Sequence, residues 1–433
     1  MKVLIIGGGF AGLSAAYYSA LHGYDVLLLE SSSVVGGAWR PIKANRFNYP
    51  IDNGQHILSS TYTATLDFLR ASGADKLFWD TGRLNVPFIQ NSKKYKLNTT
   101  LLPSPFGELL GILLYRKLSL KSKISIINFM RRIAKIKPNK AYTAEEYLLA
   151  EKQSQNAIEY FWAPIIVSAC NANPADVSAV VVYNMLMKIF GNKNIQSNLL
   201  IPKVPVKFIL YQIITLLVKN DVEIQVSKTL KTINSKNGVI HSIETADGEI
   251  FRADIFIFAT SLKTKEFILN ESFYQNGTHY SGIVNAHFLY DRPIMKEKYV
   301  SLLGTNLQWV FEEQNAGEFG YLYKLTSSAA KQIIGKDSNT IKHIFVTEII
   351  NNFPLAKEAK LLQSQVIKEK FATPILYPQF QKKRPKTQTH YKNMFLAGAY
   401  VDTGLPITIE SAVISGKMAA EAVKKYRDEH YSI

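Results

Sequence analysis

The sequence predicts an α/β protein in which a doubly wound parallel sheet and a β-meander form one domain and a discontinuous α+β domain forms the other. Three observations lead to this prediction. A glycine-rich turn joins an apolar strand to a helix within the first 22 residues, and further strand-like segments return at 222–258 and 393–398. The length of 433 residues also exceeds what one compact core usually supports.

The first element is the apolar run Lys2 to Ile6, KVLII, which is typical of a buried parallel strand. It is followed by GGGFAG, with Gly7, Gly9 and Gly12 in GxGxxG spacing, and by helical spacing from Ala11 to His22. Gly7 permits a tight turn, Gly9 lets a pyrophosphate approach the backbone, and Gly12 lets helix and strand pack closely.

The helix that follows these glycines begins near Phe10 and Ala11, where free N–H groups and a partial positive charge favour phosphate. A second apolar run, Asp25 to Leu29, ends at Glu30, which is followed by Ser31. An acid at this place accepts hydrogen bonds from ribose hydroxyls and repels a 2′-phosphate. The segment therefore predicts a site for an adenine dinucleotide.

A second glycine pair, Gly36 and Gly37, stands six residues beyond Glu30. This E-x5-GG arrangement resembles the flavin amine oxidases and carotenoid desaturases, in which the second loop closes over the pyrophosphate of FAD. The resemblance implies a Rossmann-like FAD-binding domain. It also implies cofactor contacts from this loop, at Gly37, Ala38, Trp39 and Arg40. The family usually has arginine directly after the glycines, so Arg40 is expected to replace it.

Two later segments are expected to return to the same crevice. The first runs from Val222 through turns at 236–238 and 247–248 to the buried strand IFIFAT, and the resemblance places adenine near Leu230. The second contains a strand, Asn393 to Gly398, and a long helix from Thr408. By resemblance, Gly398 approaches the ribityl chain and the Ile409 N–H faces flavin O2. Further expected contacts in this stretch are Ala399, where flavin enzymes commonly have aspartate, Pro406 and Thr408.

These segments predict the domain organisation. Residues 1–75, 195–262 and 385–433 are assigned to the FAD-binding domain. Residues 76–194 and 263–384 are assigned to a domain that binds substrate and contacts a membrane.

Several short stretches resemble one subfamily, the squalene-associated FAD-dependent desaturases whose known activity is hydroxysqualene dehydroxylation. They are IDNGQHI at 51–57, FWAPIIVSACNANPADVSA at 161–179, LQWVFEE at 307–313, EKFAT at 369–373 and TGLPITIESAVISG at 403–416. The resemblance implies that hydride from reduced flavin N5 removes the hydroxyl of hydroxysqualene, making squalene for hopanoid or related triterpenoid synthesis. Such a reaction needs an external electron donor, an apolar cavity and one acid that protonates the departing hydroxyl.

The candidate catalytic residues are Asp52, Gln55 and His56, in the stretch that resembles the part of the family chain passing the flavin ring. Asn53, Gly54 and Gln55 are also expected to contact the cofactor. Either Asp52 or His56 could be the proton donor. Asp52 could instead cap a turn, and His56 could be structural. No metal-ligand spacing and no Ser/His/Asp assembly is visible, so no metal is expected.

The segment 105–140 is strongly basic. Between Tyr115 and Lys140 it has no acid, and its cations are interleaved with leucine, isoleucine, Phe129 and Met130. The cations are Arg116, Lys117, Lys121, Lys123, Arg131, Arg132, Lys135, Lys137 and Lys140. This pattern is typical of a pair of interfacial amphipathic helices, which would bring the enzyme to a lipid-dissolved isoprenoid. Core-packed helices with solvated lysines are the alternative.

The net charge of +17 favours an anionic surface, and nucleic acid is not expected because no nucleic-acid-binding motif accompanies the charge. Phe208 to Val218 is too short to span a membrane and is expected to be a buried helix. The single cysteine, Cys170, and a first strand that starts almost at Met1 predict a cytoplasmic, peripherally membrane-associated protein.

Three other functions stay open at this point. The same fold serves carotenoid or phytoene-type desaturases and isomerases, which oxidise a polyene. A non-catalytic FAD-bound membrane scaffold is a second possibility. An amine oxidase is disfavoured because no aromatic pair beside the flavin can be identified.

Overall fold

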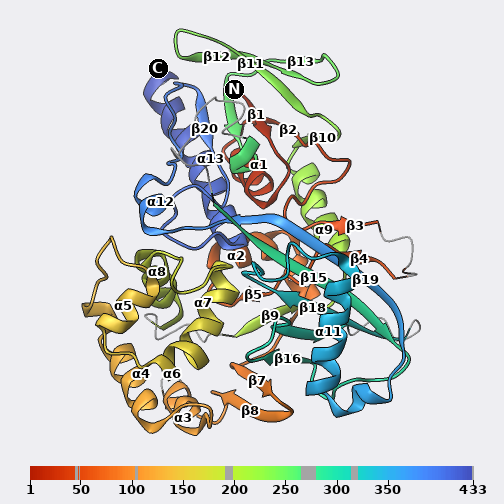
Figure 1. Cartoon of the computed structure of the whole chain (residues 1–433). Coiled ribbons are helices and arrows are strands. Elements are labelled where there is room, and N and C mark those ends of the chain that lie inside the picture. The colour runs from red at the N-terminus through yellow and green to blue at the C-terminus, as the bar shows by residue number, and fades with distance from the viewer. Residues whose placement is uncertain are drawn as a thin grey trace.

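The computed structural model describes residues 1–43, 47, 49–102, 106–190, 198–264, 279–313 and 320–431. Figure 1 shows a five-stranded sheet with its helices and a β-meander at the top, and a seven-stranded sheet beside a lobe of helices below. The first strand and the last helix both belong to the upper part.

The upper sheet is parallel throughout. β1 (Lys2–Ile6) pairs with β2 (Asp25–Leu29) on one side and with β14 (Ile255–Phe258) on the other. β10 (Glu223–Gln225) and β20 (Met394–Leu396) form its two edges, giving the order β10-β2-β1-β14-β20. Strands from three distant parts of the chain therefore end at one edge of one sheet, as the sequence predicts.

Both faces of this sheet are covered. Val3 and Ile5 share a core with α1 (Phe10–Leu21), α9 (Val206–Lys219) and α13 (Ile409–Tyr431). Leu4 and Ile6, which point to the other face, share a core with the meander. The predicted α/β fold with a doubly wound sheet is confirmed.

The meander consists of β11 (Leu230–Lys236), β12 (Val239–Thr245) and β13 (Ile250–Phe251). Asn237 and Gly238, in the first turn, both have positive φ angles, 53° and 74°. Two such residues in succession match the twist of a two-residue hairpin loop. The meander predicted from these turn residues is therefore confirmed.

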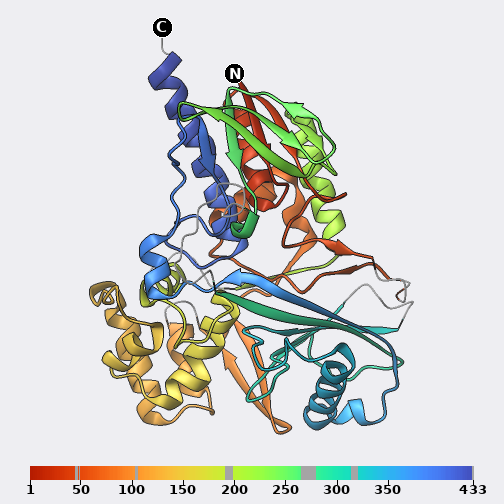
Figure 2. The ribbon, with the colours of Figure 1, turned by 45° about the horizontal axis from the view of Figure 1, so that its top comes forward.

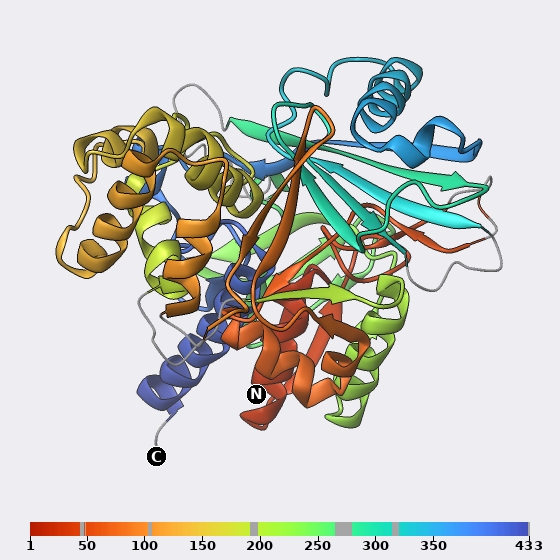
Figure 3. The ribbon, with the colours of Figure 1, turned by 90° about the horizontal axis from the view of Figure 1, so that it is seen from below.

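The seven-stranded sheet forms the floor of the lower part, in the order β19-β15-β18-β17-β16-β7-β8. Its strands are β7 (Asn85–Gln90), β8 (Lys93–Asn98), β15 (Tyr280–Tyr290), β16 (Tyr299–Leu302), β17 (Trp309–Glu312), β18 (Tyr321–Ser327) and β19 (Leu361–Pro374). Figure 2 shows the long strands β15 and β19 running beneath the upper part. α11 (Ser338–Asn352) covers one face, and Figure 3 shows the β7–β8 hairpin between α11 and the lobe of helices.

The lobe of helices is built from residues 106–190. Its helices are α3 (Phe106–Leu114), α4 (Leu120–Arg132), η2 (Ile133–Lys135), α5 (Ala144–Ala150), α6 (Gln155–Ala157), the π-turn η3 (Ile158–Trp162), α7 (Ala163–Cys170) and α8 (Ala179–Phe190). Trp162 is buried at its centre and donates from Nε1 to Gln153 Oε1 at 2.9 Å. The predicted helix pair in the basic segment corresponds to α3 and α4.

The elements not yet named lie outside the two large sheets and the lobe of helices. They are β3 (Pro41–Ile42), β4 (Ile51–Asp52), β5 (Leu58–Ser59), α2 (Thr63–Ser72), η1 (Ala74–Leu77), β6 (Phe78–Asp80), β9 (Leu199–Pro202), η5 (Pro354–Lys357) and α12 (Pro378–Lys383). The strands of the two large sheets fall on either side of the predicted domain boundaries, which themselves stay a prediction.

One helix differs from its prediction. α9 was expected to be buried, but Phe208, Tyr211 and Val218 are exposed, and only the opposite side packs in the core. Apolar residues of this run lie on both sides of the helix, but only one side packs against the sheet. The apolar residues on the other side are left exposed. Within the described ranges, no helix is both long and apolar enough to cross a bilayer.

Candidate functional site

The turn between β1 and α1 leaves no room for side chains. Gly7 has φ +111°, and a Cβ on Gly12 would lie 1.8 Å from the Gly7 carbonyl oxygen. α1 begins after Gly9 with no side-chain cap and no acid in its first turn, which includes Phe10 and Ala11. The N-terminus of α1 therefore offers backbone N–H groups and the positive end of the helix dipole to an anion.

The second glycine pair lies directly against this turn. The Gly36 N–H donates to the Gly8 carbonyl at 2.8 Å, and a Cβ on Gly37, which has φ +61°, would lie 2.9 Å from Gly9 Cα. We call residues 7–12 and 36–37 the glycine cradle. Its backbones approach so closely that Cβ atoms would fill the space in which a pyrophosphate is expected.

Glu30 lies beside the glycine cradle at the end of β2. It is buried, its Oε2 accepts from the Gly8 N–H at 2.6 Å, and its Oε1 accepts from Ser31 Oγ at 3.1 Å. The Glu30 carbonyl accepts from the Lys228 N–H at 2.8 Å, which brings the start of β11 and Leu230 to the same place. The acid, Ser31 and Leu230 thus gather where the adenosine part of a dinucleotide is predicted.

Trp39 is buried rather than facing an open site. Its ring stacks on Phe10 with centroids 5.5 Å apart and on His56 with centroids 5.0 Å apart. A cofactor contact at Trp39 would therefore involve its backbone. The stack joins the glycine cradle to the segment of residues 52–56.

Arg40 lies next to the glycine cradle but is also paired with an acid. Its Nη1 donates to the Gly37 carbonyl at 3.1 Å, and its Nη2 lies 3.0 Å from Glu369 Oε1. Asn53 joins the same group, because its Nδ2 donates to the Ala38 carbonyl at 2.9 Å and its Oδ1 accepts from the Arg40 N–H at 3.2 Å. Glu369, from the stretch EKFAT, accepts hydrogen bonds from both Arg40 and Asn53, which the sequence did not predict.

Asp52 is buried at the end of β4. Both its carboxylate oxygens accept from the Val206 N–H at 3.1 Å, so Asp52 caps the N-terminus of α9. Burial raises the pKa of Asp52 to about 6, while the charge of Lys324 and the Val206 N–H oppose the rise. Asp52 therefore caps a distant helix rather than the turn that follows it in sequence, and its role as a proton donor stays a prediction.

His56 has the opposite protonation behaviour. Its Nε2 lies 3.3 Å from Asn53 Oδ1, and desolvation together with the charges of Lys324 and Arg40 lowers its pKa to about 3. The ring is therefore neutral near pH 7. The neighbouring Gln55 is half-buried, and a Cβ on Gly54 would lie 2.4 Å from Asn285 Nδ2.

Three polar residues that were not predicted from the sequence, His287, Glu313 and Lys324, lie close to Asp52. His287 Nε2 lies 2.9 Å from the Asp52 carbonyl, which makes Nε2 the protonated nitrogen, and the buried Nδ1 has no hydrogen-bond partner among the described residues. Lys324, opposite His287 in the β15–β18 pair, forms a buried ion pair with Glu313. Desolvation and the Lys324 charge lower the pKa of His287 to about 3. We call Asp52, His287, Glu313 and Lys324 the buried polar cluster.

Asn285 extends this contact toward the glycine cradle. Its Nδ2 donates to the Asn53 carbonyl at 3.0 Å, and its Oδ1 accepts from Thr326 Oγ1 at 3.0 Å. Asn285 and His287 are alternate residues of YSGIVNAHFLY, an otherwise largely apolar strand. Two polar residues on one face of such a strand were the signal that could have identified them.

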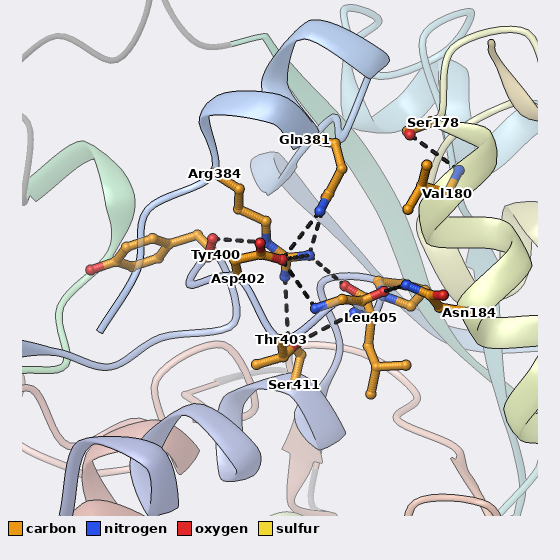
Figure 4. A network of polar contacts seen from close by, with 12 residues as sticks. Ser178, Val180, Asn184, Gln381, Arg384, Tyr400, Asp402, Thr403, Leu405 and Ser411 are labelled. Carbon is orange, nitrogen blue, oxygen red and sulfur yellow. Dashed lines mark hydrogen bonds and ion pairs between the residues drawn. The ribbon is translucent and has the colours of Figure 1, made fainter. Parts of the chain in front are cut away.

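The C-terminal loop, residues 398–408, is shaped by a buried arginine, as Figure 4 shows. Arg384 donates to the carbonyl groups of three loop residues, Ala399 at 2.8 Å, Tyr400 at 3.0 Å and Leu405 at 2.7 Å. Asn184 of α8 holds the same loop by donating to the Gly404 carbonyl at 2.9 Å. The sequence analysis did not identify Arg384, which lies before the motif-bearing stretch.

The loop then leads into α13 beside α1. Gly398 has φ +142°, and its N–H donates to Ser415 Oγ at 2.8 Å. A Cβ on Gly416 would lie 2.2 Å from the Ala11 carbonyl oxygen, so α13 packs closely against the first turn of α1. This packing brings the other predicted contacts of the loop, Pro406, Thr408 and Ile409, into the same region as the glycine cradle. Their contact with a cofactor stays a prediction, as it does for the other site residues.

The cradle, the acid after β2 and the returning C-terminal loop define an α/β protein that binds a dinucleotide cofactor. The chain matches the flavin containing amine oxidoreductase family over residues 10–424, and it therefore belongs to that family. FAD is its cofactor, and the chain is an FAD-dependent oxidoreductase. The glycine cradle fits this group because it leaves backbone N–H groups and space at the N-terminus of α1.

Comparison with individual proteins agrees with the family. The chain is 25% identical over 426 residues to a hydroxysqualene dehydroxylase of Zymomonas mobilis, covering 96% of this chain and 97% of that one. It is 21% identical to a 15-cis-phytoene desaturase of Glycine max, covering 98% and 79%. An oxidoreductase structure from Methanosarcina mazei superposes with a TM-score of 0.73 at 15% identity, covering 98% and 100%. The predicted resemblance to this superfamily, and to its squalene-associated members, is confirmed.

Proposed function

We propose that this FAD-dependent oxidoreductase acts on a long isoprenoid, and that its reaction is the reductive dehydroxylation of hydroxysqualene to squalene. The observation that carries the proposal is the alignment with a hydroxysqualene dehydroxylase over 96% of this chain and 97% of the relative. A second such relative, from Sinorhizobium fredii, is 24% identical over 97% of both chains. The squalene formed would serve hopanoid or related triterpenoid synthesis.

The reaction breaks one C–O bond and forms one C–H bond. Reduced FAD supplies the two electrons as hydride, and an external electron donor must reduce it again. The departing hydroxyl takes up a proton and leaves as water, so the site must hold one proton near the substrate. Among the predicted catalytic residues, Asp52 is the one that could supply this proton, because its pKa is raised to about 6 and a minor fraction of its carboxyl is still protonated at pH 7. Neutral His56 and Gln55 would form the polar side of the site.

The test is an anaerobic incubation of dithionite-reduced protein with hydroxysqualene, in which flavin reoxidation and squalene are measured together. We expect one squalene for each flavin reoxidised. Reduced flavin that stays reduced, with no squalene formed, would overturn the proposed reaction and favour a non-catalytic FAD-bound scaffold.

A second candidate is the oxidation of a polyene by a phytoene-type desaturase. The alignment with phytoene desaturases over 98% of this chain supports it, although it covers less of those relatives. Mass spectrometry of oxidised protein incubated with phytoene and an electron acceptor separates the two. Loss of two hydrogens from phytoene, without activity on hydroxysqualene, would favour the desaturase.

We further propose that the protein works as a cytoplasmic enzyme bound peripherally to a membrane, because a long isoprenoid dissolves in the bilayer. The concentration of cations in α4 and the residues after it supports this location. The prediction fails if squalene forms from detergent-dispersed substrate while the protein never associates with membranes of the cell.

A further inference from the structure

The outer side of α3 and α4 is a place where exposed apolar side chains gather. These side chains are between 44% and 70% exposed. They are Leu102, Phe106, Leu113, Leu114, Leu120 and Ile124, and we call them the docking face. The helices α3 and α4 lie at the lower left of Figure 1, away from the five-stranded sheet. Exposed large apolar side chains that gather on neighbouring helices often mark a surface that contacts a partner or a membrane.

α3 has the reverse of the usual arrangement of a surface helix. Its packed side carries glycines: a Cβ on Gly107 would lie 2.4 Å from the Thr99 carbonyl oxygen, and a Cβ on Gly111 would lie 2.7 Å from the Asn98 carbonyl oxygen. The glycines let α3 lie close to the end of β8. Ile112 is the one large apolar side chain of α3 that is fully buried, and Phe106 and Leu114 remain exposed.

The exposed side of α4 becomes more cationic along its length. Leu120 and Ile124 are exposed in its first half beside one cation, Lys121, and its second half exposes Asn128, Arg131 and Arg132. A surface pocket of about 480 Å³ opens there. It is lined by Asn128, Arg131, Arg132, Ala150, Glu151 and Lys152.

This pocket carries an excess of positive charge. Arg132 Nη2 lies 3.4 Å from Glu151 Oε2, so one acid is matched by one arginine. Arg131 and Lys152 remain as additional cations, and residues 115–143 contain no acid. Neither cation forms an ion pair with another described residue, so a phosphate group would find two available positive charges near the docking face.

We propose that the docking face sits in the surface of an anionic phospholipid bilayer, and that the pocket between α4 and α5 takes the phosphate of a lipid headgroup. Apolar side chains beside a cationic edge match the boundary between acyl chains and anionic headgroups. A second copy of this chain fits less well, because the same cations would face each other. The inference rests on the proposed function in one respect only: an isoprenoid substrate dissolved in the bilayer gives the enzyme a reason to bind there.

The experiment is flotation of the FAD-loaded full chain with phosphatidylcholine vesicles that contain 0 or about 30% phosphatidylglycerol, at low and high salt, without any isoprenoid. We expect binding to the anionic vesicles, weakened by salt. The apolar variant Phe106→Ser/Leu113→Ser should lose binding at least about tenfold even at low salt. The pocket variant Arg131→Gln/Lys152→Gln should weaken it by about fivefold for each charge removed, and only on anionic vesicles.

Matched controls remove exposed residues of the same kinds elsewhere. Phe208→Ser/Tyr211→Ser changes the exposed side of α9, and Lys331→Gln/Lys357→Gln removes two exposed lysines of the lower part. Both controls should float like the wild type. Equal losses in the controls, or no flotation of the wild type at low salt, would overturn the inference.

Sedimentation velocity tests whether a second copy of the chain, rather than a bilayer, covers the docking face. If Phe106→Ser/Leu113→Ser converts a dimer to a monomer and leaves vesicle binding unchanged, the docking face joins two copies and the inference is wrong. Since flotation uses no substrate, vesicle binding without hydroxysqualene turnover would remove the proposed function and keep the docking face. Turnover of hydroxysqualene without vesicle binding would keep the proposed function and remove the docking face.

Discussion

The glycine cradle and the buried polar cluster hold opposite ends of the same segment, residues 36–54. The cradle has no charged side chain and works through close approach of backbones, such as the contact of Gly37 with Gly9. The cluster works through charges removed from water, above all the ion pair of Lys324 and Glu313. The cradle depends on glycines that have no Cβ atom, and the cluster depends on each buried charge having a partner. The two regions should therefore respond to substitution in different ways.

The largest functional effect, loss of the bound FAD, is expected in the cradle. A Cβ on Gly12 would lie 1.8 Å from the Gly7 carbonyl oxygen, so Gly12→Ala should separate β1 from α1, cost about 3 kcal/mol and leave the purified protein without FAD. The absorbance of bound flavin measures this loss. Gly335→Ala is the matched control, since a Cβ there meets no atom within 4 Å. Normal flavin content in Gly12→Ala would show that the cradle is not needed for FAD.

The next effect is expected in the cluster. Lys324→Met leaves Glu313 buried without its partner, and should lower the free energy of unfolding by about 3–5 kcal/mol. The double variant Glu313→Gln/Lys324→Met should recover much of that loss, because the buried charge of Glu313 is removed together with that of Lys324. Urea unfolding of the FAD-loaded protein measures both.

The exposed pair of Lys231 and Glu244 is the control for the cluster. Lys231 is 57% exposed, so Lys231→Met should change stability by less than about 1 kcal/mol. A double variant as unstable as Lys324→Met would contradict the pairing argument.

The same difference explains how far the sequence could predict each region. The turn at Gly7 to Gly12 is local, and the spacing of its glycines is fixed by one strand, one turn and one helix. The meander and the helix at the C-terminus were predictable for the same reason. The partner of Asp52 is not local, because Val206 and His287 lie 154 and 235 residues further along the chain.

Such partners depend on the register of strands that pair over long distances. His287 faces Lys324 only because β15 and β18 pair in one antiparallel register. Arg384 was missed for a related reason, since its carbonyl acceptors in the loop carry no sequence signal. The alternation of polar residues in β15 predicts that His287 and Asn285 lie on the same face of the strand. It does not predict which residues of other strands they contact.

A smaller effect, seen through pH, separates Asp52 from the histidines. Its folded pKa of about 6 lies above the usual 3.8, so the folded state binds the proton more tightly, and stability falls as pH rises from about 4 to 6.5. The pKa values of His56 and His287 are lowered to about 3. Their contribution to the free energy of unfolding is therefore lost as pH falls from about 6.5 toward 3.

Asp52→Asn isolates the first contribution, because it keeps an oxygen for the Val206 N–H and leaves both histidines in place. Relative to the wild type, the variant should gain about 3 kcal/mol between pH 4 and pH 7. Unfolding curves across this range measure the gain. A pH-independent difference would show that the Asp52 carboxyl is not destabilised by burial. If squalene formation at pH 7 is also unchanged, Asp52 is not the proton donor.

The smallest effect concerns Arg40, where the two ends of the segment meet. Its guanidinium lies beside the cradle at the Gly37 carbonyl but is paired with Glu369, and both side chains are partly exposed. If Arg40 attracts the pyrophosphate, Arg40→Gln should weaken FAD binding about fivefold and Glu369→Gln should strengthen it, because the acid no longer competes. Fluorescence titration of the deflavinated protein gives both dissociation constants. If both variants weaken binding equally, Arg40 and Glu369 act together to hold the segment, and the predicted phosphate contact of Arg40 is wrong.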